Sequence, residues 1–272
     1  MLLICCKVTT KLSDINVYSD LTNSTLFSVD SCNSTQDLML DFLKQNESYR
    51  NRMLGLFTSR QFQGKGQRGN AWYAEVDQSL ALTLAMPLQG WMEQDLVLTN
   101  KAISVVVCGS VAPFIDEPVQ LKWPNDLFVQ NQKLGGMLLQ THTENNQKYL
   151  ILGIGLNVNA VPEPVFKSAV CMSDFTKVEL EIPEIADRIF THLAQFLSTS
   201  NANNSEHMNE LYLDKLWKRN ESVTVHFYNN ELIAKSEACI LMGVDAEGRL
   251  LIQTATGNIE AFHHGEVRLA HT

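Results

Sequence analysis

The chain has 272 residues, 45% hydrophobic and 19% charged, which is enough for one large core and a small second domain. Its net charge of −9 argues against a broad nucleic-acid-binding surface, because such a surface needs a basic face. The six cysteines are irregularly spaced and form no C-x-x-C pair, so we expect reduced thiols in a cytoplasmic protein. We expect no membrane segment, because no apolar stretch approaches the length of a span. The seven histidines show no metal-ligand spacing, and we expect no structural zinc.

The N-terminal quarter predicts a helix between strands. Residues 1–24 are polar and poorly patterned, and the sequence assigns them neither an element nor a role. The run 25–30 predicts a strand. Ser34 begins a helix, because Ser34 and Asp37 have capping-box spacing and four apolar side chains share one helical face. The run 53–58 predicts a second strand, which ends at a glycine-rich loop.

The middle of the chain predicts further strands and three helices. Residues 79–87 alternate between larger apolar and smaller side chains, which is the period of a strand. A long apolar segment predicts a helix over 93–115. The runs 119–123, 127–130, 133–142 and 148–159 predict consecutive strands joined by turns. Two helices follow at about 183–198 and 205–217, with a polar linker over 198–205.

The pattern of apolar and polar residues changes after residue 222. Short alternating runs occur at 223–228, 237–244, 249–255 and 259–264, with turn residues at Asn229-Asn230, 245–248 and 256–258. This spacing predicts a small, partly closed β-barrel of about 50 residues. We expect the pair His263-His264 to lie at the surface or at the edge of a strand.

The loop "QFQGKGQRGNAW" (61–72) contains a G-x-G-x-x-G pattern. In a dinucleotide-binding fold a helix opens at the third glycine, and an acidic residue follows about 20 residues later. Here Gly69 leads into a strand pattern and the later segment has no carboxylate, so we reject that interpretation. Glycines allow backbone N–H groups to converge on an anion, while Lys65 and Arg68 supply charge. The loop is either a lid over a phosphate or an ordinary mobile loop.

Four further segments add to the loop. Ser34 and Thr35 place hydroxyls at a helix N-terminus, where they cap the helix or meet a polar ligand. "KWPND" (122–126) lies between two strands. "KLGG" (133–136) and "GIGLNVN" (153–159) place glycines inside strands, where glycine often marks the close approach of a ligand and otherwise reflects sheet packing.

In this order the segments resemble the biotin protein ligases, over roughly residues 26–160. The resemblance implies an α+β fold, with a mixed β-sheet flanked by helices, as in class II synthetases, over 1–220. It also implies a small SH3-like β-barrel over 221–272. The implied activity joins biotin to ATP and forms biotinyl-5'-AMP and pyrophosphate. The reaction uses Mg²⁺. The biotinyl group then passes to one lysine of a biotin carboxyl carrier domain of a carboxylase.

The resemblance also implies roles for individual residues. The implied biotin-binding residues are Ser34, Thr35, Gln61, Gly64, Gly66, Lys133, Gly135, Gly136 and Gly153. The implied nucleotide-binding residues are Lys65, Gln67, Arg68, Gly69, Trp72, Lys122, Asn125 and Asn157. Lys133 matches the catalytic lysine, and Lys65 and Arg68 would neutralise the phosphates beside it. Asp126 is the candidate Mg²⁺ ligand, because hard cations prefer carboxylate oxygen, with a plain turn residue as its alternative role.

The chain departs from the family pattern in the loop and in the helix start. Lys65 and Gln67 stand where the family commonly has arginine, so we expect a looser hold on the adenylate. Gln36 stands where the family often has asparagine.

About 25 residues precede the first predicted strand, too few for a DNA-binding module. We therefore expect a ligase without a nucleic-acid partner. We also expect no membrane partner, and either a monomer or a homodimer. A lipoate ligase of the same fold and a non-catalytic ligand-binding relative stay open as alternatives.

Overall fold

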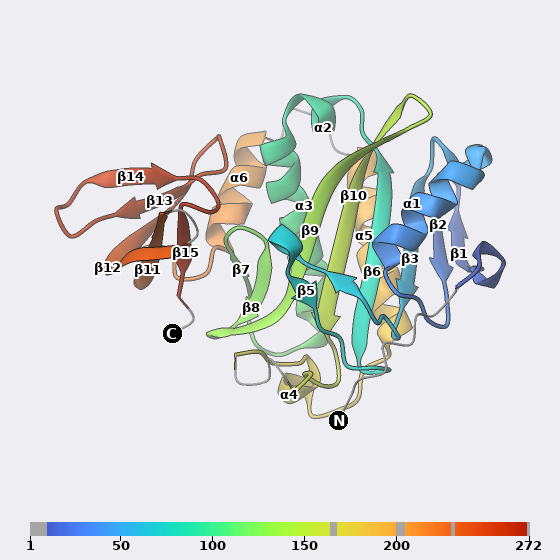
Figure 1. The fold of residues 1–272 in the computed structure, drawn as a ribbon, viewed down its shortest axis with the longest axis horizontal. Coiled ribbons are helices and arrows are strands. Elements are labelled where there is room, and N and C mark those ends of the chain that lie inside the picture. The colour runs from blue at the N-terminus through green and yellow to red at the C-terminus, as the bar shows by residue number, and fades with distance from the viewer. Residues whose placement is uncertain (1–9, 164–167, 200–204, 230–231, 271–272) are drawn as a thin grey trace.

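An eight-stranded mixed sheet forms the centre of the molecule in the computed structural model (Figure 1). The residues described are 10–163, 168–199, 205–229 and 232–270. In spatial order the strands are β1 (Asn16–Leu21), β2 (Ser24–Ser28), β3 (Met53–Thr58), β6 (Ser79–Pro87), β10 (Gln147–Asn157), β9 (Gln132–Glu144), β8 (Asp126–Val129) and β7 (Val119–Lys122). Among the strands described in this sheet, β2 and β3 alone pair in parallel. The predictions for Cys5, Cys6, most of the linker 198–205 and Asn230 lie outside the described residues.

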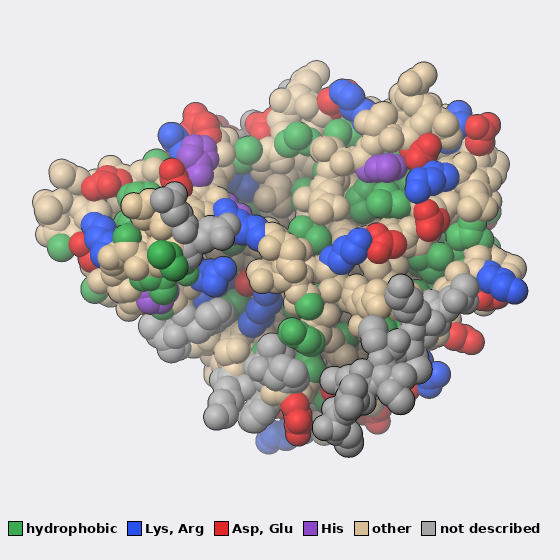
Figure 2. Space-filling view, in the orientation of Figure 1, with side chains coloured by type: hydrophobic (Ala, Val, Ile, Leu, Met, Phe, Trp, Pro, Cys, Tyr) green, Lys and Arg blue, Asp and Glu red, His purple; other side chains and the backbone are tan. Residues whose placement is uncertain are grey.

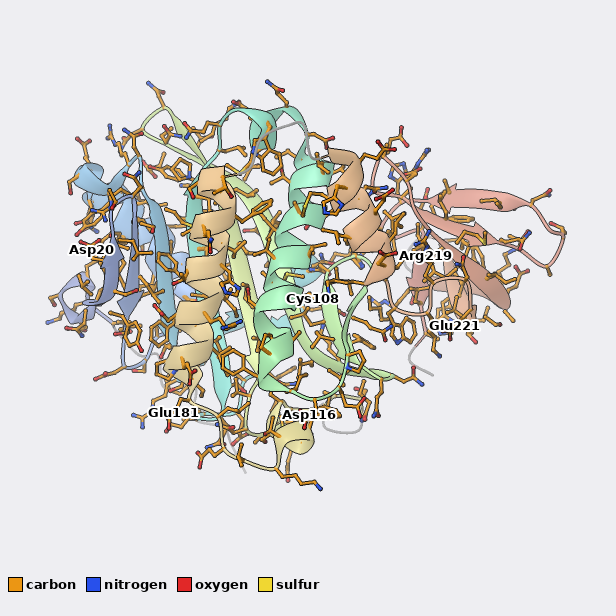
Figure 3. All side chains as sticks on the ribbon, turned by 180° about the vertical axis from the view of Figure 1, so that it is seen from behind. Asp20, Cys108, Asp116, Glu181, Arg219 and Glu221 are labelled. Carbon is orange, nitrogen blue, oxygen red and sulfur yellow. The ribbon has the colours of Figure 1, made fainter. Side chains whose placement is uncertain are left out.

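The two faces of this sheet are covered by different helices. On one face, α1 (Thr35–Gln45) packs on β3, β6 and β10 and closes a small core with side chains such as Phe27 and Leu54. On the other face, α3 (Leu96–Val111), α5 (Ile182–Thr199) and α6 (Ser205–Asp214) lie side by side (Figure 3). Their larger core includes Leu80, Leu82 and Leu84 of β6. Short helices are α2 (Trp91–Gln94) and α4 (Ser173–Thr176). These layers confirm the predicted α+β class, with a mixed sheet flanked by helices.

The expectation that no apolar stretch reaches the length of a membrane span was wrong. Leu96–Phe114 forms a helical segment of 19 residues with a mean hydropathy of 1.5, long and apolar enough to cross a membrane by composition alone. Here α3 packs against α5, α6 and β7, with Ile103, Val107 and Cys108 fully buried. Its apolar character is therefore accounted for by a central place in the core.

A second sheet of five antiparallel strands follows, at the left of Figure 1. In spatial order the strands are β14 (Ile259–Phe262), β13 (Leu250–Gln253), β12 (Leu232–Val244), β11 (Ser222–Asn229) and β15 (Val267–Leu269). The predicted small C-terminal β unit is present as this antiparallel sheet, with β14 and β15 at its two edges, and its partial closure into a barrel stays a prediction. A division into domains at residues 220 and 221 stays a prediction.

One segment without a prediction forms a strand, one local prediction needs correction, and one is confirmed. The segment 1–24, read as patternless, contains β1, which pairs antiparallel with β2. The helix predicted over 93–115 is divided, because Asp95 caps a new helix by accepting a hydrogen bond from the Leu98 N–H. Within the glycine-rich loop, β4 (Gly64–Lys65) and β5 (Ala71–Trp72) form a two-stranded hairpin. A strand therefore does follow Gly69, as the rejection of the dinucleotide fold required.

Candidate active site

A cavity of about 560 Å³ lies between the α1 face of the central sheet, the β4–β5 hairpin and the C-terminal sheet. Figure 2 shows the hollow between the C-terminal sheet at the left and the main body, with Lys and Arg side chains along it. The sequence-predicted residues that line it are Ser34, Thr35, Gln61, Lys65, Gly66, Gln67, Arg68, Trp72, Lys122, Asn125, Asp126, Lys133, Gly136 and Gly153. The fold thus brings most of the predicted site to one place.

Buried hydroxyl and amide groups form one end of the cavity. Thr83 Oγ1 donates to Thr35 Oγ1 at 2.9 Å, and Thr35 Oγ1 donates to Gln61 Oε1 at 3.1 Å. The Thr35 backbone N–H donates to the same oxygen at 2.8 Å. This arrangement follows from the start of α1, where Ser34 is the N-cap and Thr35 is the first helical residue. The backbone N–H groups of a first helical turn lack partners within the helix, so a side-chain acceptor such as Gln61 satisfies one.

Glycines on β10 and β9 form the floor. Gly153 lies directly opposite Thr83 on β6, and Gly155 lies opposite Gly136 on β9. A Cβ on Gly153 would lie 2.8 Å from Gln36 Nε2, and a Cβ on Gly155 would overlap the Trp72 indole. The bare backbone of Gly155 is therefore occupied by Trp72 of the hairpin, which is the close approach that makes glycine necessary there.

Lys133 reaches the cavity because of a bulge in β9. On a regular strand, residues 133 and 136 would face opposite sides of the sheet. Leu134 is an extra residue relative to β8, since Gly135 pairs with Leu127 and Lys133 with Phe128. Leu134 is fully buried in the core, while the Lys133 ammonium lies over the cavity floor, 3.3 Å from where a Cβ on Gly136 would be.

The Lys133 ammonium has two neighbours. Asp126 Oδ1 lies 2.7 Å from Nζ, with both side chains only partly exposed. The Trp72 ring centroid lies 5.7 Å from the same nitrogen, within the range of a cation–π contact. These contacts fix the position of a positive charge above the floor.

Lys122 is a second cation near Lys133, and its side chain is buried. It is 4% exposed, its Nζ lies 4.6 Å from the ring centroids of Phe128 and Trp217, and it donates to the Ala270 carbonyl at 3.3 Å. Burial lowers the pKa of Lys122 to about 8, although Asp126 opposes the shift. Its charge is therefore poised near neutral pH.

The hairpin is held by both sides of the cavity. Lys65 Nζ lies 2.5 Å from Asp37 Oδ1 on α1, as an exposed ion pair. Arg68 Nη2 donates to the His264 carbonyl of the C-terminal sheet at 2.7 Å. A Cβ on Gly265 would overlap this guanidinium, so Arg68 sits tightly on the turn that follows β14. Outside the hairpin, Trp123 also links the main body to the C-terminal sheet, because its Nε1 donates a hydrogen bond to the Gly248 carbonyl at 3.0 Å.

Four predicted residues lie outside the cavity lining: Gly64, Gly69, Gly135 and Asn157. A Cβ on Gly135 would lie 2.5 Å from the Gly155 carbonyl and from Leu156, so sheet packing explains this glycine. Asn157 is buried and donates to the Val170 carbonyl at 3.1 Å.

Sequence reasoning missed several lining residues, among them Thr83, Tyr228, His264 and Arg268. Thr83 could have been identified from the sequence, because it is a polar residue inside an otherwise apolar strand. The other three come from the C-terminal sheet, whose docking beside the cavity has no signature in the sequence. His264 is exposed, as expected, and its ring also contacts the Trp123 ring edge-on, with the two centroids 5.6 Å apart.

The sequence profile of the biotin/lipoate A/B protein ligase family matches residues 28–157, which span β3, the hairpin, β6 and the β7–β10 strands that build this cavity. The matched stretch is 130 of the 272 residues, so the similarity to this family is established for that part of the chain. The match confirms the resemblance that the motifs indicated.

Individual members of the family are similar over part of their length. A biotin–[acetyl-CoA-carboxylase] ligase of Mycobacterium tuberculosis is 32% identical over 157 residues, covering 54% of this chain and 56% of that protein. A human biotin–protein ligase is 30% identical over 125 residues, covering 44% of this chain and 16% of that protein. The chain thus spans a little over half of one relative and a small part of the other.

A solved member shares the fold over nearly the whole chain. The biotin protein ligase of Aquifex aeolicus, in complex with biotin and ATP, superposes with a TM-score of 0.71 at 22% identity. The superposition covers 93% of this chain and 100% of that one, so it includes the C-terminal sheet. At this identity the likeness establishes the fold alone.

Proposed function

We propose that the protein is a biotin protein ligase, which activates biotin with ATP and transfers it to a lysine of a carrier domain. One observation carries the proposal. A single cavity joins a polar end, built on Thr35, Gln61 and Thr83, to a cationic end around Lys133. The two ends lie next to each other along β10. Gly153 lies opposite Thr83 at the polar end, and Gly155 lies opposite Gly136 at the cationic end. A successive step on one face of a strand spans about 7 Å.

The polar end suits a ureido ring, which presents one carbonyl oxygen and two N–H groups. Ser34, Thr35 and Gln61 would exchange hydrogen bonds with it. Leu138 and Ile154 also line the cavity and offer apolar surface to a bicyclic ring and an aliphatic tail. A mostly apolar site with a few polar groups at one end is the usual form of a small-molecule pocket.

The cationic end suits adenylation. A carboxylate oxygen of biotin attacks the α-phosphorus of ATP, the bond from that phosphorus to the bridging oxygen breaks, and pyrophosphate leaves. Both partners are anions, so the barrier falls when fixed cations neutralise them. Lys133 would contact the carboxylate and the α-phosphate. Arg68, Lys122 and Arg268 line the same cavity and would neutralise the rest of the triphosphate.

Mg²⁺ would be held by Asp126 together with phosphate oxygens of ATP. Among the residues described, no group of three acidic, histidine or cysteine side chains could hold a metal alone, while Asp126 lies in the cavity. That donor set fits Mg²⁺, which usually binds through one or two carboxylates, substrate phosphates and water. The ion would supply further positive charge at the triphosphate.

The hairpin would keep the adenylate dry. Acyl-adenylates hydrolyse, so a cover that excludes water preserves the intermediate until the acceptor lysine arrives. Lys65 and Arg68, tied to α1 and to the C-terminal sheet, hold the hairpin across the cavity. The acceptor amine then attacks the acyl carbon and AMP leaves. We propose that the acceptor is a biotin carboxyl carrier domain.

ATP–pyrophosphate exchange tests the first step. We expect exchange that depends on added biotin and on Mg²⁺, and no stimulation by lipoate. Stimulation by lipoate and not by biotin would make the protein a lipoate ligase. Absence of exchange with either acid would identify a non-catalytic binding relative.

Transfer tests the second step. The protein is incubated with labelled biotin, ATP and a biotin carboxyl carrier domain, and label on the carrier is measured. A carrier domain with its acceptor lysine changed to arginine is the matched control. Label on both carriers, or on neither, would contradict specific transfer.

A further inference from the structure

The backbone of Lys133 is held from two sides, although β10 does not reach it. Lys133 pairs with β8 on one side, and on the other side the pairing of β9 with β10 begins only at Gly135. Residues 168–172, which we call the backing segment, lie beside Lys133 in place of β10. The Lys133 N–H donates to the Ser168 carbonyl at 3.1 Å, and the Val170 N–H donates to the Lys133 carbonyl at 3.0 Å. The backing segment thus supports the bulge that turns Lys133 toward the cavity.

Asn157, the last residue of β10, fastens the backing segment. Its side-chain Nδ2 donates to the Val170 carbonyl at 3.1 Å, and its backbone carbonyl accepts from the Met172 N–H at 3.1 Å. Two consecutive hydrogen bonds therefore connect the Asn157 amide to the backbone of Lys133 by way of Val170. Without the first of these bonds, the Val170 carbonyl loses its partner and the support of Lys133 can shift.

In this structure Asn157 acts within the protein and not at the cavity surface. It is 2% exposed and lies outside the cavity lining. Its Oδ1 is also buried and has no hydrogen-bond partner among the residues described, so almost no surface of this atom is open to a ligand. The family resemblance implied a nucleotide contact at this position. A contact with ATP and a role in holding Lys133 predict different kinetic effects, and this difference separates the two roles.

We propose that Asn157 is a positioning residue, which holds the backing segment against β9 and thereby keeps the Lys133 ammonium where the biotin carboxylate meets the α-phosphate. The assignment rests on the proposed function and adds to it a residue that acts through Lys133. A shift of a catalytic group by about 1 Å lowers a rate by up to about 10²-fold. One hydrogen bond in the support of Lys133 therefore affects catalysis more than it affects folding.

Asn159 provides a matched control in the same motif. Its Nδ2 donates to the Leu180 carbonyl at 2.9 Å, and its Oδ1 accepts from the Leu180 N–H at 2.9 Å. Neither of these two residues lines the cavity. Asn159→Ala therefore removes two hydrogen bonds to a segment other than the backing segment, whereas Asn157→Ala removes the bond to Val170. Asn157→Leu, which fills the position without a donor, is a second variant.

Biotin-dependent ATP–pyrophosphate exchange gives kcat and the KM for ATP of each variant, and thermal unfolding without ligand gives its stability. We expect both Asn157 variants to lower kcat about tenfold, with the KM for ATP within about twofold of the wild type. Asn159→Ala should keep the wild-type kcat and yet unfold at a lower temperature than Asn157→Ala, because it loses more hydrogen bonds. An effect of lost stability alone would give the opposite order of activities.

A double variant tests whether Asn157 acts through Lys133. In Lys133→Met the ammonium is absent, so adding Asn157→Ala should cause no further loss of exchange. A loss in the double variant equal to the product of the two single losses would overturn the assignment.

The other outcomes separate this assignment from the proposed function. A higher KM for ATP with kcat unchanged would make Asn157 a nucleotide contact, and wild-type kinetics in both Asn157 variants would show that the bond to Val170 is dispensable. Equal losses of kcat in Asn157→Ala and Asn159→Ala, or failure of both Asn157 variants to fold, would make Asn157 a structural residue. Each of these results overturns the assignment and leaves the proposed function standing. If the wild type shows no biotin-dependent exchange, both are wrong.

Discussion

Lys133 Nζ lies 2.7 Å from Asp126 Oδ1, and the pair joins two strands at a point where β9 carries an extra residue. The bulge turns Lys133 toward the cavity, and the carboxylate then holds the ammonium over Gly136. The position of the cation therefore depends on the backbone irregularity as much as on the residue itself.

Replacing Lys133 by methionine should nearly abolish adenylation. Removing a fixed charge from the place where the reacting anions meet costs about 10²–10³-fold in rate. Asp126→Asn keeps the cation and loosens its position, so a smaller loss is expected. Biotin-dependent pyrophosphate exchange measures both. At saturating Mg²⁺, an equal loss in the two variants would show that Asp126 does more than hold the Lys133 ammonium in position.

Gly265→Ala should release the hairpin from the C-terminal sheet. A Cβ at this position would overlap the Arg68 guanidinium, and φ is +107°. The matched control is Gly257→Ala, where φ is +86° and nothing lies within 4 Å of the new Cβ. Both changes should lower the free energy of unfolding, by about 1–2 kcal/mol for the backbone strain.

Only Gly265→Ala should speed the release of biotinyl-AMP into solution, measured by chasing labelled adenylate from the protein. Equal release rates in the two variants would mean that the Arg68 contact does not close the cavity.

The charge on Lys122 should shape the pH profile. Its pKa of about 8 lies below the ordinary 10.5, so the cation is present below about pH 8 and is lost as the pH rises through that value. If this cation helps to bind ATP, kcat/KM for ATP should fall above about pH 8, because that ratio reports the free enzyme. Lys122→Arg keeps its charge throughout, and the falling limb should disappear. A flat wild-type profile from about pH 7 to 9.5 would argue against the role of Lys122.

Gly155→Ala should displace Trp72 from the floor. The added methyl group overlaps the indole, so the ring must move toward solvent. We expect easier quenching of tryptophan fluorescence by acrylamide and a higher KM for ATP. Gly109→Ala is the control, because this exposed helical position has open space and should gain about 0.5–1 kcal/mol of stability. Unchanged quenching in Gly155→Ala would show that the floor can rearrange beneath the ring.

Much of the main sheet was predictable because its strands have strong patterns. The β6 run alternates cleanly, and the helix at Ser34 has a cap that can be read from four residues. β1 escaped prediction because its side chains are mostly exposed and its apolar residues, Val17, Tyr18 and Leu21, do not alternate with the polar ones. The break at Asp95 was missed because the apolar run on either side dominates the local pattern.

Most of the candidate site was predictable from motifs, because glycines and lysines in strands stand out against apolar neighbours. What the motifs could not give is which face each residue takes. The bulge at Leu134 decides this for Lys133, and no residue type signals a bulge there. Gly135 was predicted to meet biotin, yet its bare Cα faces Gly155 and Leu156. Tertiary docking likewise placed His264 and Arg268 beside the cavity without a local signal.

Three side-chain hydrogen bonds from the main body to the C-terminal sheet all end on main-chain oxygen. Arg68 donates to the His264 carbonyl, Trp123 to Gly248 and Lys122 to Ala270. Every residue has the same backbone carbonyl group. Substitutions of the side chains of His264, Gly248 and Ala270 should therefore leave these hydrogen bonds in place. Redesign of that sheet should therefore keep its backbone path and its turns, and can vary most other positions.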